Sequence, residues 1–342
     1  MNFKKPFLIA EISANHNGSI HNAKKLIDCA KKNGADAVKL QTYTPDTMTI
    51  KSNKAYFKIK EGPWKGYKLW DLYKKAHTPL KWHKELFQYA KKKNIKIFST
   101  PFDETAVDFL EELKCPFYKV ASFEMTDIPL IKKIAQTKKP MIISTGMANL
   151  NEIEATYKCA KKYGAKKIIL LYCVSNYPSK NSDFNLKNIE ILRKKFKCDI
   201  GLSDHSKDNL IAALAVSQGA VVIEKHIALQ NQKKGLDLEF SLKGDELKEF
   251  RRVLNDSFEL VKNKKFFRND SENKSKIFRR SIFSVKDVKK GEKFTKQNIK
   301  RIRPGFGLEP MYYEKLLGKK SLKYISKGEP LKKDILKKYK LY

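Results

Sequence analysis

The feature that most constrains this chain of 342 residues is a regular alternation of short apolar runs with segments of helical period between residues 6 and 262. Runs rich in Val, Ile and Leu are typical of strands buried on both faces, and strict alternation with helices predicts a parallel sheet with right-handed crossovers. The apolar runs, each ending in polar or small residues, are FLIAEISANH, AVKLQTY, IKIFSTPFD, FYKVAS, PMIISTGM, KIILLYCVSNYP, IGLSDHS and AVVIEKH.

Eight strand and helix units close naturally into a (β/α)₈ barrel, which is the fold class that we predict for residues 1–262. A doubly wound open sheet is the alternative, but it usually has a glycine-rich turn after its first strand, and ISANHNGS does not match GxGxxG. The second connection, residues 42–78, is long and aromatic. Its rings either lie over the pocket or only hold the loop together. They belong to Tyr43, Tyr56, Phe57, Trp64, Tyr67, Trp70 and Tyr73.

The sequence changes character after residue 262. Residues 263–278 are polar, charged and without a clear period, so we interpret them as a linker. Residues 279–342 mix short apolar runs with Gly and Pro turns, which predicts a small β-rich domain. A domain of this size has a thin core, so we expect it to dock on its own barrel or on another subunit.

Composition narrows the class of protein. The net charge of +35 would suit nucleic acid or an anionic membrane, but the lysines are spread over nearly every expected helix, which favours a solvated surface. The five cysteines form no CxxC pair, so we expect reduced, structural thiols. No apolar stretch approaches the roughly 20 residues of a membrane span, and the N-terminus turns polar too early for a signal peptide. We expect a cytoplasmic protein that binds neither nucleic acid nor membrane.

Two histidines lie at the ends of neighbouring strands of the expected barrel, His205 at the end of the seventh strand and His226 at the end of the eighth. A single histidine at a strand end is usually a hydrogen-bonded structural residue. Two neutral imidazoles on adjacent strands can instead hold one face of a divalent ion such as Mn²⁺, Co²⁺, Fe²⁺ or Zn²⁺ and leave other positions open. We therefore predict a metal site at His205 and His226.

Charged residues also interrupt the apolar strands. Lys39 and Lys119 would be costly to bury without an anionic partner, which indicates a phosphate or carboxylate ligand, with a Schiff-base lysine as the alternative. Glu11 and Glu124 either move protons or form salt bridges with those lysines. Because all strand ends of a barrel face one mouth, we expect the other polar residues there to join them. These are Asn15, His16, Gln41, Ser99, Thr100, Ser122, Ser144, Gly146, Ser175, Asn176, Tyr177, Ser203, Asp204, Glu224 and Lys225.

These segments carry a resemblance to a known family, the sialic acid synthases, which condense phosphoenolpyruvate with an N-acetylated sugar to make nine-carbon nonulosonic acids. The motifs are most similar to those of the pseudaminic acid synthases: this chain has ISANHN, LQTYTPDT and ASFE where neuraminate synthases usually have IGxNH, HQTH and GSGE. The motifs, which cover nearly the whole chain in the family's order, are AEISANHNG, KLQTYTPDT, STPFDETAVDFLEEL, YKVASFE, IISTGMA, GLSDHS, VIEKH and RPGFG.

The resemblance implies a barrel followed by an antifreeze-like (SAF) domain in a domain-swapped homodimer, with Arg303 reaching the sugar's acetamido group from the partner subunit. It implies His205 and His226 as ligands of Mn²⁺, or else Co²⁺ or Mg²⁺, and Glu11 and Glu124 as acidic catalytic groups. The phosphoenolpyruvate contacts implied are Lys39, Lys119, Ser144 and Gly146. Further pocket contacts implied are Gln41, Thr100, Ser122, Ser175, Tyr177 and Ser203.

The activity implied is a metal-dependent condensation of phosphoenolpyruvate with the open-chain aldehyde of 2,4-diacetamido-2,4,6-trideoxy-L-altrose, with release of phosphate by carbon-oxygen cleavage. Such a product serves carbohydrate biosynthesis, including flagellin glycosylation. An N-acetylneuraminate or legionaminate synthase is the nearer alternative. A basic nucleic-acid-binding protein is the remote one, and it leaves the strand-end histidines and glutamates unexplained.

Overall fold

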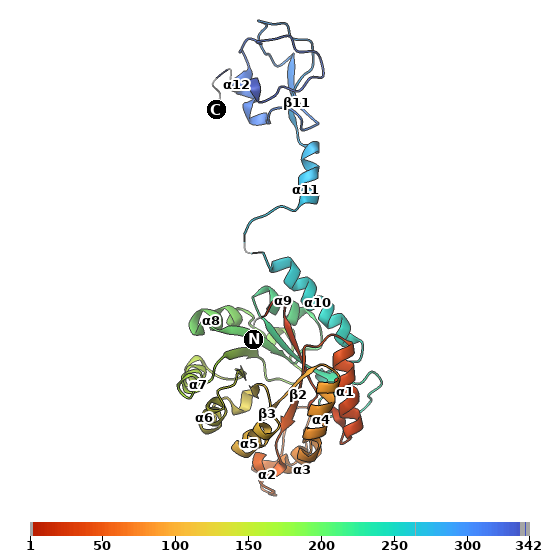
Figure 1. Ribbon diagram of the computed structural model, residues 1–342, viewed down its shortest axis with the longest axis vertical. Helices are drawn as coiled ribbons and strands as arrows, with labels where there is room; N and C mark the ends of the chain where they lie inside the picture. Colours follow the sequence, from red (N-terminus) through yellow and green to blue (C-terminus); the bar gives the residue numbers. More distant parts are fainter. Residues whose placement is uncertain (1–2, 264, 336–338, 340–342) are drawn as a thin grey trace. The chain divides into compact units, whose positions relative to one another are not determined.

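The computed structural model describes residues 3–263, 265–335 and 339. Eight parallel strands pair in chain order, and the first pairs with the eighth, so the sheet closes into a barrel (Figure 1). The prediction of a (β/α)₈ barrel is confirmed. The barrel strands are β1 (Phe7–Glu11), β2 (Ala37–Thr42), β3 (Lys96–Pro101), β4 (Tyr118–Val120), β5 (Met141–Ser144), β6 (Ile168–Cys173), β7 (Asp199–Asp204) and β8 (Val222–Ala228).

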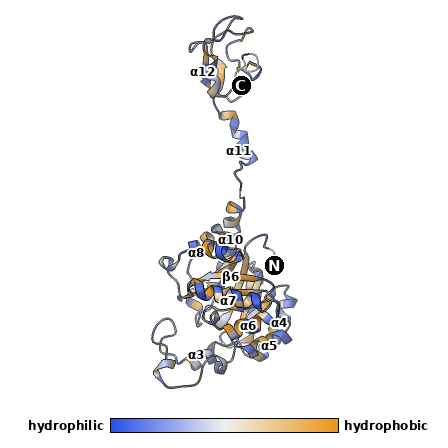
Figure 2. Cartoon of the chain, turned by 90° about the vertical axis from the view of Figure 1, so that its left-hand side faces the viewer, coloured by the Kyte–Doolittle hydropathy of each residue, from blue (hydrophilic) through white to orange (hydrophobic). Residues whose placement is uncertain are grey.

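Helices surround the barrel, and the hydropathy colours separate the two layers (Figure 2). The strands are mostly hydrophobic because both of their faces are buried, whereas most helices have one apolar face toward the sheet and one polar face toward solvent; α9 (Leu210–Ser217) is apolar on both faces. The helices of this layer are α1 (Ile20–Lys32), α4 (Leu80–Lys92), α5 (Glu104–Glu112), α6 (Ile128–Gln136), α7 (Leu150–Lys162), α8 (Lys187–Phe196), α9 (Leu210–Ser217) and α10 (Glu246–Val261).

Local sequence signals set the bounds of these helices. Asn149 caps α7: its side chain accepts from the backbone N–H of Asn151 and of Glu152, and the Glu152 carboxylate accepts from the N–H of Asn149. Gly164 follows the last turn at a φ of +107°, which favours glycine. Such caps return the chain from each helix to the next strand over a few residues.

The long connection after β2 contains helices of its own. These are α2 (Pro45–Met48), the short 3₁₀ turn η2 (Ala55–Phe57) and α3 (Leu69–Ala76). Another short strand, β9 (Leu242–Lys243), extends the sheet beside β8 and follows the 3₁₀ turn η5 (Leu238–Phe240). Both segments stand at the carboxyl ends of the strands, where the site described below is formed.

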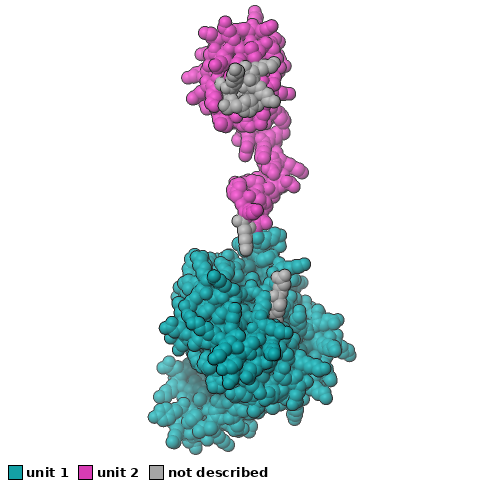
Figure 3. All heavy atoms as spheres, turned by 60° about the vertical axis from the view of Figure 1, so that its left-hand side comes forward, with its two compact units in different colours: residues 1–262 teal, residues 263–342 magenta. Residues whose placement is uncertain are grey.

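Residues 1–262 and 263–342 form two compact units (Figure 3). In the second unit, β10 (Ser281–Ser284) pairs antiparallel with β11 (Ile299–Ile302). Its small core includes Ile282, Phe294 and Leu316. The segment expected to be a linker contains α11 (Asp270–Lys274) and η6 (Ser275–Phe278), and the unit also holds η7 (Pro310–Tyr312) and α12 (Tyr313–Leu316).

Within the described part of the chain, no helix combines the length and the apolar character that crossing a membrane requires.

Candidate functional site

Four charged side chains from neighbouring and facing strands meet inside the barrel, and we call them the charged floor: Glu11, Lys39, Lys119 and Glu224. The Lys39 Nζ atom lies 2.5 Å from Glu11 Oε2 and 3.6 Å from Glu224 Oε1. The Lys119 Nζ atom lies 3.7 Å from the same Glu224 oxygen. All four are buried, so each charge depends on the others for its stability.

Burial shifts the pKa values of this floor. It raises the pKa of Glu11 to about 7, although Lys39 opposes the shift. Burial also works against the charge of Lys39, but Glu11 and Glu224 outweigh it and raise the Lys39 pKa. The pKa of Lys119 is lowered by burial, while the two lysines together hold that of Glu224 below its usual range despite burial. A dianion that binds here would therefore lie close to two lysine side chains that are already paired with the carboxyl groups of Glu11 and Glu224.

Hydroxyl groups form a rim beside the lysines. Lys119 Nζ donates to Ser144 Oγ at 2.7 Å, and Lys39 Nζ donates to Thr100 Oγ1 at 3.1 Å. The backbone N–H of Gly146 donates to Ser122 Oγ at 3.3 Å. A Cβ atom on Gly146 would lie 2.2 Å from Ser175 Oγ, so only glycine lets these groups approach one another. Hydroxyls and a backbone N–H around two lysines are suited to a phosphate group.

The two histidines lie on neighbouring strand ends, with ring centroids 5.4 Å apart. The Nδ1–H of His205 donates to the Val174 carbonyl at 3.1 Å, which leaves Nε2 as the atom with a free lone pair. The Nδ1 atom of His226 is buried and has no hydrogen-bond partner among the described residues. Burial holds the pKa of His226 well below its usual value, so this ring is neutral at pH 7.

These observations fit a divalent metal, because both rings offer a nitrogen lone pair to one space. Burial alone would lower the pKa of His205, but the neighbouring Cys173 raises it. Among residues 3–263, 265–335 and 339, no group of three or more His, Cys, Asp or Glu side chains could hold an ion. The chain therefore offers two imidazoles and leaves the remaining positions to water or substrate.

A cavity of about 350 Å³ is lined by His226, whereas His205 and the four floor residues are not among its lining residues. Glu124, in the 3₁₀ turn η3 (Ser122–Glu124), lines one side together with Gln41, Tyr177 and His226. The Glu124 Oε2 atom is buried and has no hydrogen-bond partner in the described residues, and burial raises the pKa of this group to about 7. Glu124 is therefore placed to give or take a proton near neutral pH.

The cavity is also lined by a group of mostly apolar side chains, which we call the apolar wall. It comes mainly from the long connection after β2, while the Trp64 indole N–H donates to the Leu236 carbonyl at 3.0 Å and ties that connection to the loop after β8. Of the seven aromatic residues noted there, Tyr43, Trp64 and Tyr73 line the cavity, whereas Tyr56 is 90% exposed. The wall consists of Tyr43, Met48, Ile59, Leu69, Leu72, Tyr73 and Phe102.

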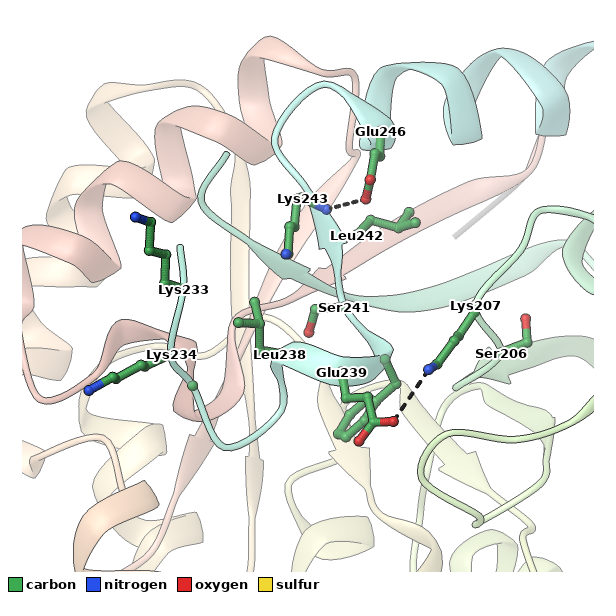
Figure 4. Close-up of a pocket in the computed structure, with 12 residues that line it drawn as sticks. Ser206, Lys207, Lys233, Lys234, Leu238, Glu239, Ser241, Leu242, Lys243 and Glu246 are labelled. Carbon is green, nitrogen blue, oxygen red and sulfur yellow. Dashed lines mark hydrogen bonds and ion pairs between the residues drawn. The ribbon is translucent and has the colours of Figure 1, made fainter. Parts of the chain in front are cut away.

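A second, open hollow is lined by residues of η5 and β9 and contains none of the predicted site residues (Figure 4). It is surrounded by Lys207, Lys233, Lys234 and Lys243. Lys207 pairs with Glu239 at 3.3 Å, and the backbone N–H of Lys243 donates to Glu246. Its four lysines are surface or half-buried groups and none of the predicted site residues lines it, so we do not assign it to the candidate site.

Some expected members of the mouth point elsewhere, as three of them illustrate. His16 is buried against Trp82 of α4, and its Nδ1 accepts from the N–H of Gly18. Asp204 and Lys225 pair with each other, and the Lys225 Nζ lies 5.8 Å from the Phe250 ring of α10, outside the barrel. The expectation that every polar strand-end residue faces the pocket was wrong for Asp204 and Lys225, because side chains alternate along a strand. It was wrong for His16 because this residue lies in the 3₁₀ turn η1 (Ser13–His16) and not on a strand.

Arg303 belongs to the second unit, where it follows β11 and is exposed. Its neighbours in RPGFG include Phe306, also exposed at 61%. The structure thus places all the predicted site residues but Arg303 in the barrel unit, and Arg303 in the other unit.

Asp237, just before η5, is a residue of the cavity that the sequence did not single out. Its Oδ2 accepts from Ser13 Oγ and lies 3.9 Å from His226 Nδ1. Phe240 packs its ring 4.9 Å from that of His226 and 5.9 Å from that of His205. The one available signal was their position just beyond the eighth strand, within the last connection of the barrel.

The model of the NeuB family matches residues 26–265, and the model of the SAF domain matches residues 279–337. The chain belongs to the NeuB family.

Three similar proteins illustrate the family. The chain is 44% identical over 329 residues to the pseudaminic acid synthase of Campylobacter jejuni, with 96% of each chain covered. It is 40% identical over 336 residues to the N,N'-diacetyllegionaminic acid synthase of the same species, which covers 95% of this chain and 98% of that one. A crystal structure of N-acetylneuraminic acid synthetase from Leptospira borgpetersenii, in complex with citrate, gives a TM-score of 0.72 at 33% identity and covers 80% of this chain and 90% of that chain.

Proposed function

We propose that this NeuB family member is a pseudaminic acid synthase, which condenses phosphoenolpyruvate with 2,4-diacetamido-2,4,6-trideoxy-L-altrose. The observation that carries the proposal is a barrel unit that holds two unlike groups of residues: the buried charged floor, and a cavity lined by His226, Glu124 and the apolar wall. The floor suits the phosphate and carboxylate of phosphoenolpyruvate. The wall suits the methyl and acetamido groups of the sugar.

The floor residues would bind and orient phosphoenolpyruvate. Lys39 and Lys119 balance its negative charge, and Ser122, Ser144 and the N–H of Gly146 donate hydrogen bonds to its oxygens. Thr100, Ser175 and Ser203 complete the polar rim, while Gln41 and Tyr177 line the sugar side. These contacts fix the methylene carbon toward the histidines.

A divalent ion held by His205 and His226 would supply Lewis-acid polarisation of the sugar aldehyde oxygen. The methylene carbon of phosphoenolpyruvate then forms a bond to the aldehyde carbon. Water adds to the former enol carbon and gives one proton to Glu11 or Glu124, while the former aldehyde oxygen takes up a proton and becomes a hydroxyl. Phosphate then leaves with the second water proton as its carbon-oxygen bond breaks, and the former enol carbon becomes a ketone. Both glutamates have pKa values of about 7, which suits proton transfer in either direction.

The sugar is tested by assaying purified protein with added Mn²⁺ against three acceptors: the altrose derivative, N-acetylmannosamine and the legionaminate precursor. We expect the highest kcat/KM for the altrose derivative. A preference for the legionaminate precursor would favour the second candidate, which the 40% identical relative supports.

The bond cleavage and the metal have separate tests. Oxygen-18 in the bridging position of phosphoenolpyruvate should leave with phosphate, and its retention in the product would contradict this route. Chelator treatment should abolish activity, which Mn²⁺, Co²⁺ or Mg²⁺ restores to different extents. Full activity after chelation, or normal metal binding by His205→Ala and His226→Ala, would contradict the metal assignment.

We also propose that Arg303 acts across a domain-swapped homodimer. The support is its exposed position in a separate unit, together with the resemblance. Arg303→Ala and Lys119→Met should each be inactive alone, whereas co-expressed subunits should recover part of the activity. Lys300→Ala, exposed on β11, is the control and should stay active. The cytoplasmic location and the use of the product in flagellin glycosylation stay predictions.

A further inference from the structure

A fully buried ion pair lies directly behind the two histidines. Asp204 and Lys225 stand opposite each other in the register of β7 and β8, and the Lys225 Nζ lies 2.9 Å from Asp204 Oδ2. Both side chains are 0% exposed. Each residue directly precedes a histidine, so this pair is the last cross-strand link before His205 and His226.

The pair also holds the chain on the far side of His205. The Ser206 N–H donates to Asp204 Oδ1 at 2.9 Å, and Lys225 Nζ donates to the Ser206 carbonyl. Both backbone polar groups of Ser206 are therefore fixed by the ion pair. His205 is enclosed between two residues that the pair immobilises, and its own carbonyl accepts from the N–H of Ser179 at 3.0 Å.

The position of the pair excludes a direct role in substrate binding. Glu224 and His226 face into the barrel, so Lys225 between them faces outward, where its Nζ lies 5.8 Å from the Phe250 ring. A buried ion pair is weak evidence for stability, since apolar residues of similar volume often serve as well. Its contacts with Ser206, and its position next to both histidines, instead point to positioning.

We infer that Asp204 and Lys225 form a clamp that sets the distance and orientation of the two metal-binding imidazoles. The inference rests on the proposed metal site at His205 and His226. The clamp residues touch neither metal nor substrate. They act through the backbone of His205 and His226, as outer-shell partners do in other metal sites.

The main test replaces the whole pair by apolar residues, Asp204→Leu with Lys225→Met, so that no unpaired charge is left buried. Asp204→Asn is the milder variant, since it keeps an acceptor for Ser206 and loses the ion pair. The control is Arg251→Met, which breaks the ion pair between Arg251 and Asp36, 3.1 Å apart, on the same helix α10 that covers Lys225.

Mn²⁺ itself is the probe, with free Mn²⁺ measured by electron paramagnetic resonance during titration, and thermal unfolding measured on the same samples. We expect both clamp variants to bind Mn²⁺ about 10- to 100-fold more weakly than the wild type, with kcat reduced and the KM for phosphoenolpyruvate little changed. Arg251→Met should bind Mn²⁺ normally even where its melting temperature falls. Mn²⁺ affinity within twofold of the wild type in Asp204→Asn would overturn the clamp.

A readout without metal separates the clamp from the proposed function. In metal-free protein with labelled histidines, the clamp variants should shift the NMR signals of His205 and His226 and leave those of His16 and His83 in place. If the wild type binds no Mn²⁺, the proposed metal site fails, and unshifted signals of His205 and His226 would overturn the clamp independently.

Discussion

The charged floor and the apolar wall belong to the same barrel unit but are built differently. The floor residues stand on barrel strands, and each charge has an opposite charge within 4 Å on another strand. The wall comes mostly from α2, α3 and the loop between them, where side chains pack with few polar contacts. The barrel register therefore fixes the chemistry, while one connection shapes the pocket for the sugar. The two should respond to mutation separately.

Lys119→Met should break the floor most severely. It leaves Glu224 with Lys39 alone and removes the donor to Ser144. We expect kcat/KM to fall about 10³-fold and the free energy of unfolding to fall by about 3 kcal/mol. Steady-state kinetics and urea unfolding measure the two effects.

The control for this prediction is Lys133→Met, which breaks an ion pair between Lys133 and Asp108 on the surface. It should cost less than about 1 kcal/mol and leave activity unchanged. Lys119→Met with a normal KM for phosphoenolpyruvate would contradict the anion-binding role. A covalent adduct at Lys119 after borohydride treatment with substrate would favour the Schiff-base alternative.

Glu124→Gln tests the acid that lies between floor and wall. Burial raises the Glu124 pKa to about 7, so wild-type kcat/KM should change around that pH. The variant should lose this inflection and about 10²- to 10³-fold in kcat. If the inflection persists unchanged, it belongs to another group, and Glu11, with a pKa also near 7, becomes the candidate.

The same shift predicts the sign of a stability change. Folding raises the Glu124 pKa from 4.5 to about 7, so the folded state favours the protonated acid and loses stability as pH rises through that range. The free energy of unfolding of Glu124→Gln minus that of the wild type should therefore be larger at pH 8 than at pH 5, by up to about 3 kcal/mol. Glu104→Gln, at the exposed start of α5, is the control variant for this measurement.

Gly146→Ala should damage the phosphate side of the floor. The added Cβ would lie 2.2 Å from Ser175 Oγ and 2.8 Å from Ser122 Oγ, so the rim must open. We expect the KM for phosphoenolpyruvate to rise about 10²-fold, with a loss of about 2 kcal/mol of stability. Adding Ser175→Ala removes the nearest atom and should recover part of that stability. An unchanged KM would show that the rim does not hold the phosphate.

Much of the barrel could be predicted because its strands are continuous Val, Ile and Leu runs that admit few other structures. The convergence of Lys39, Lys119 and Glu11 followed from strand order alone. The outward orientation of the Asp204 and Lys225 side chains could also have been predicted, since each residue is next to a pocket histidine and neighbouring side chains on a strand point to opposite faces. Placing every strand-end residue in the mouth ignored this alternation.

The wall and Asp237 could not be predicted in the same way. Ser13 and Asp237, which form a hydrogen bond, are 224 residues apart, and neither belongs to a periodic run. Residues 43–77 gave an aromatic composition but no period, so nothing in the sequence separated Tyr73, which lines the cavity, from Tyr56, which is exposed. Which of these rings lines the cavity and which is exposed depends on the tertiary packing of short helices.

Leu69→Ser gives the smallest effect and separates wall from floor most cleanly. Leu69 begins α3 and lines the cavity without a polar partner, so a polar side chain there removes apolar contact with the sugar. We expect the KM for the sugar to rise about tenfold, with the KM for phosphoenolpyruvate and kcat nearly unchanged. Ile50→Ser, 63% exposed on the same connection and outside the cavity, is the matched control. A rise in the KM for phosphoenolpyruvate instead would mean that wall and floor act on the same substrate.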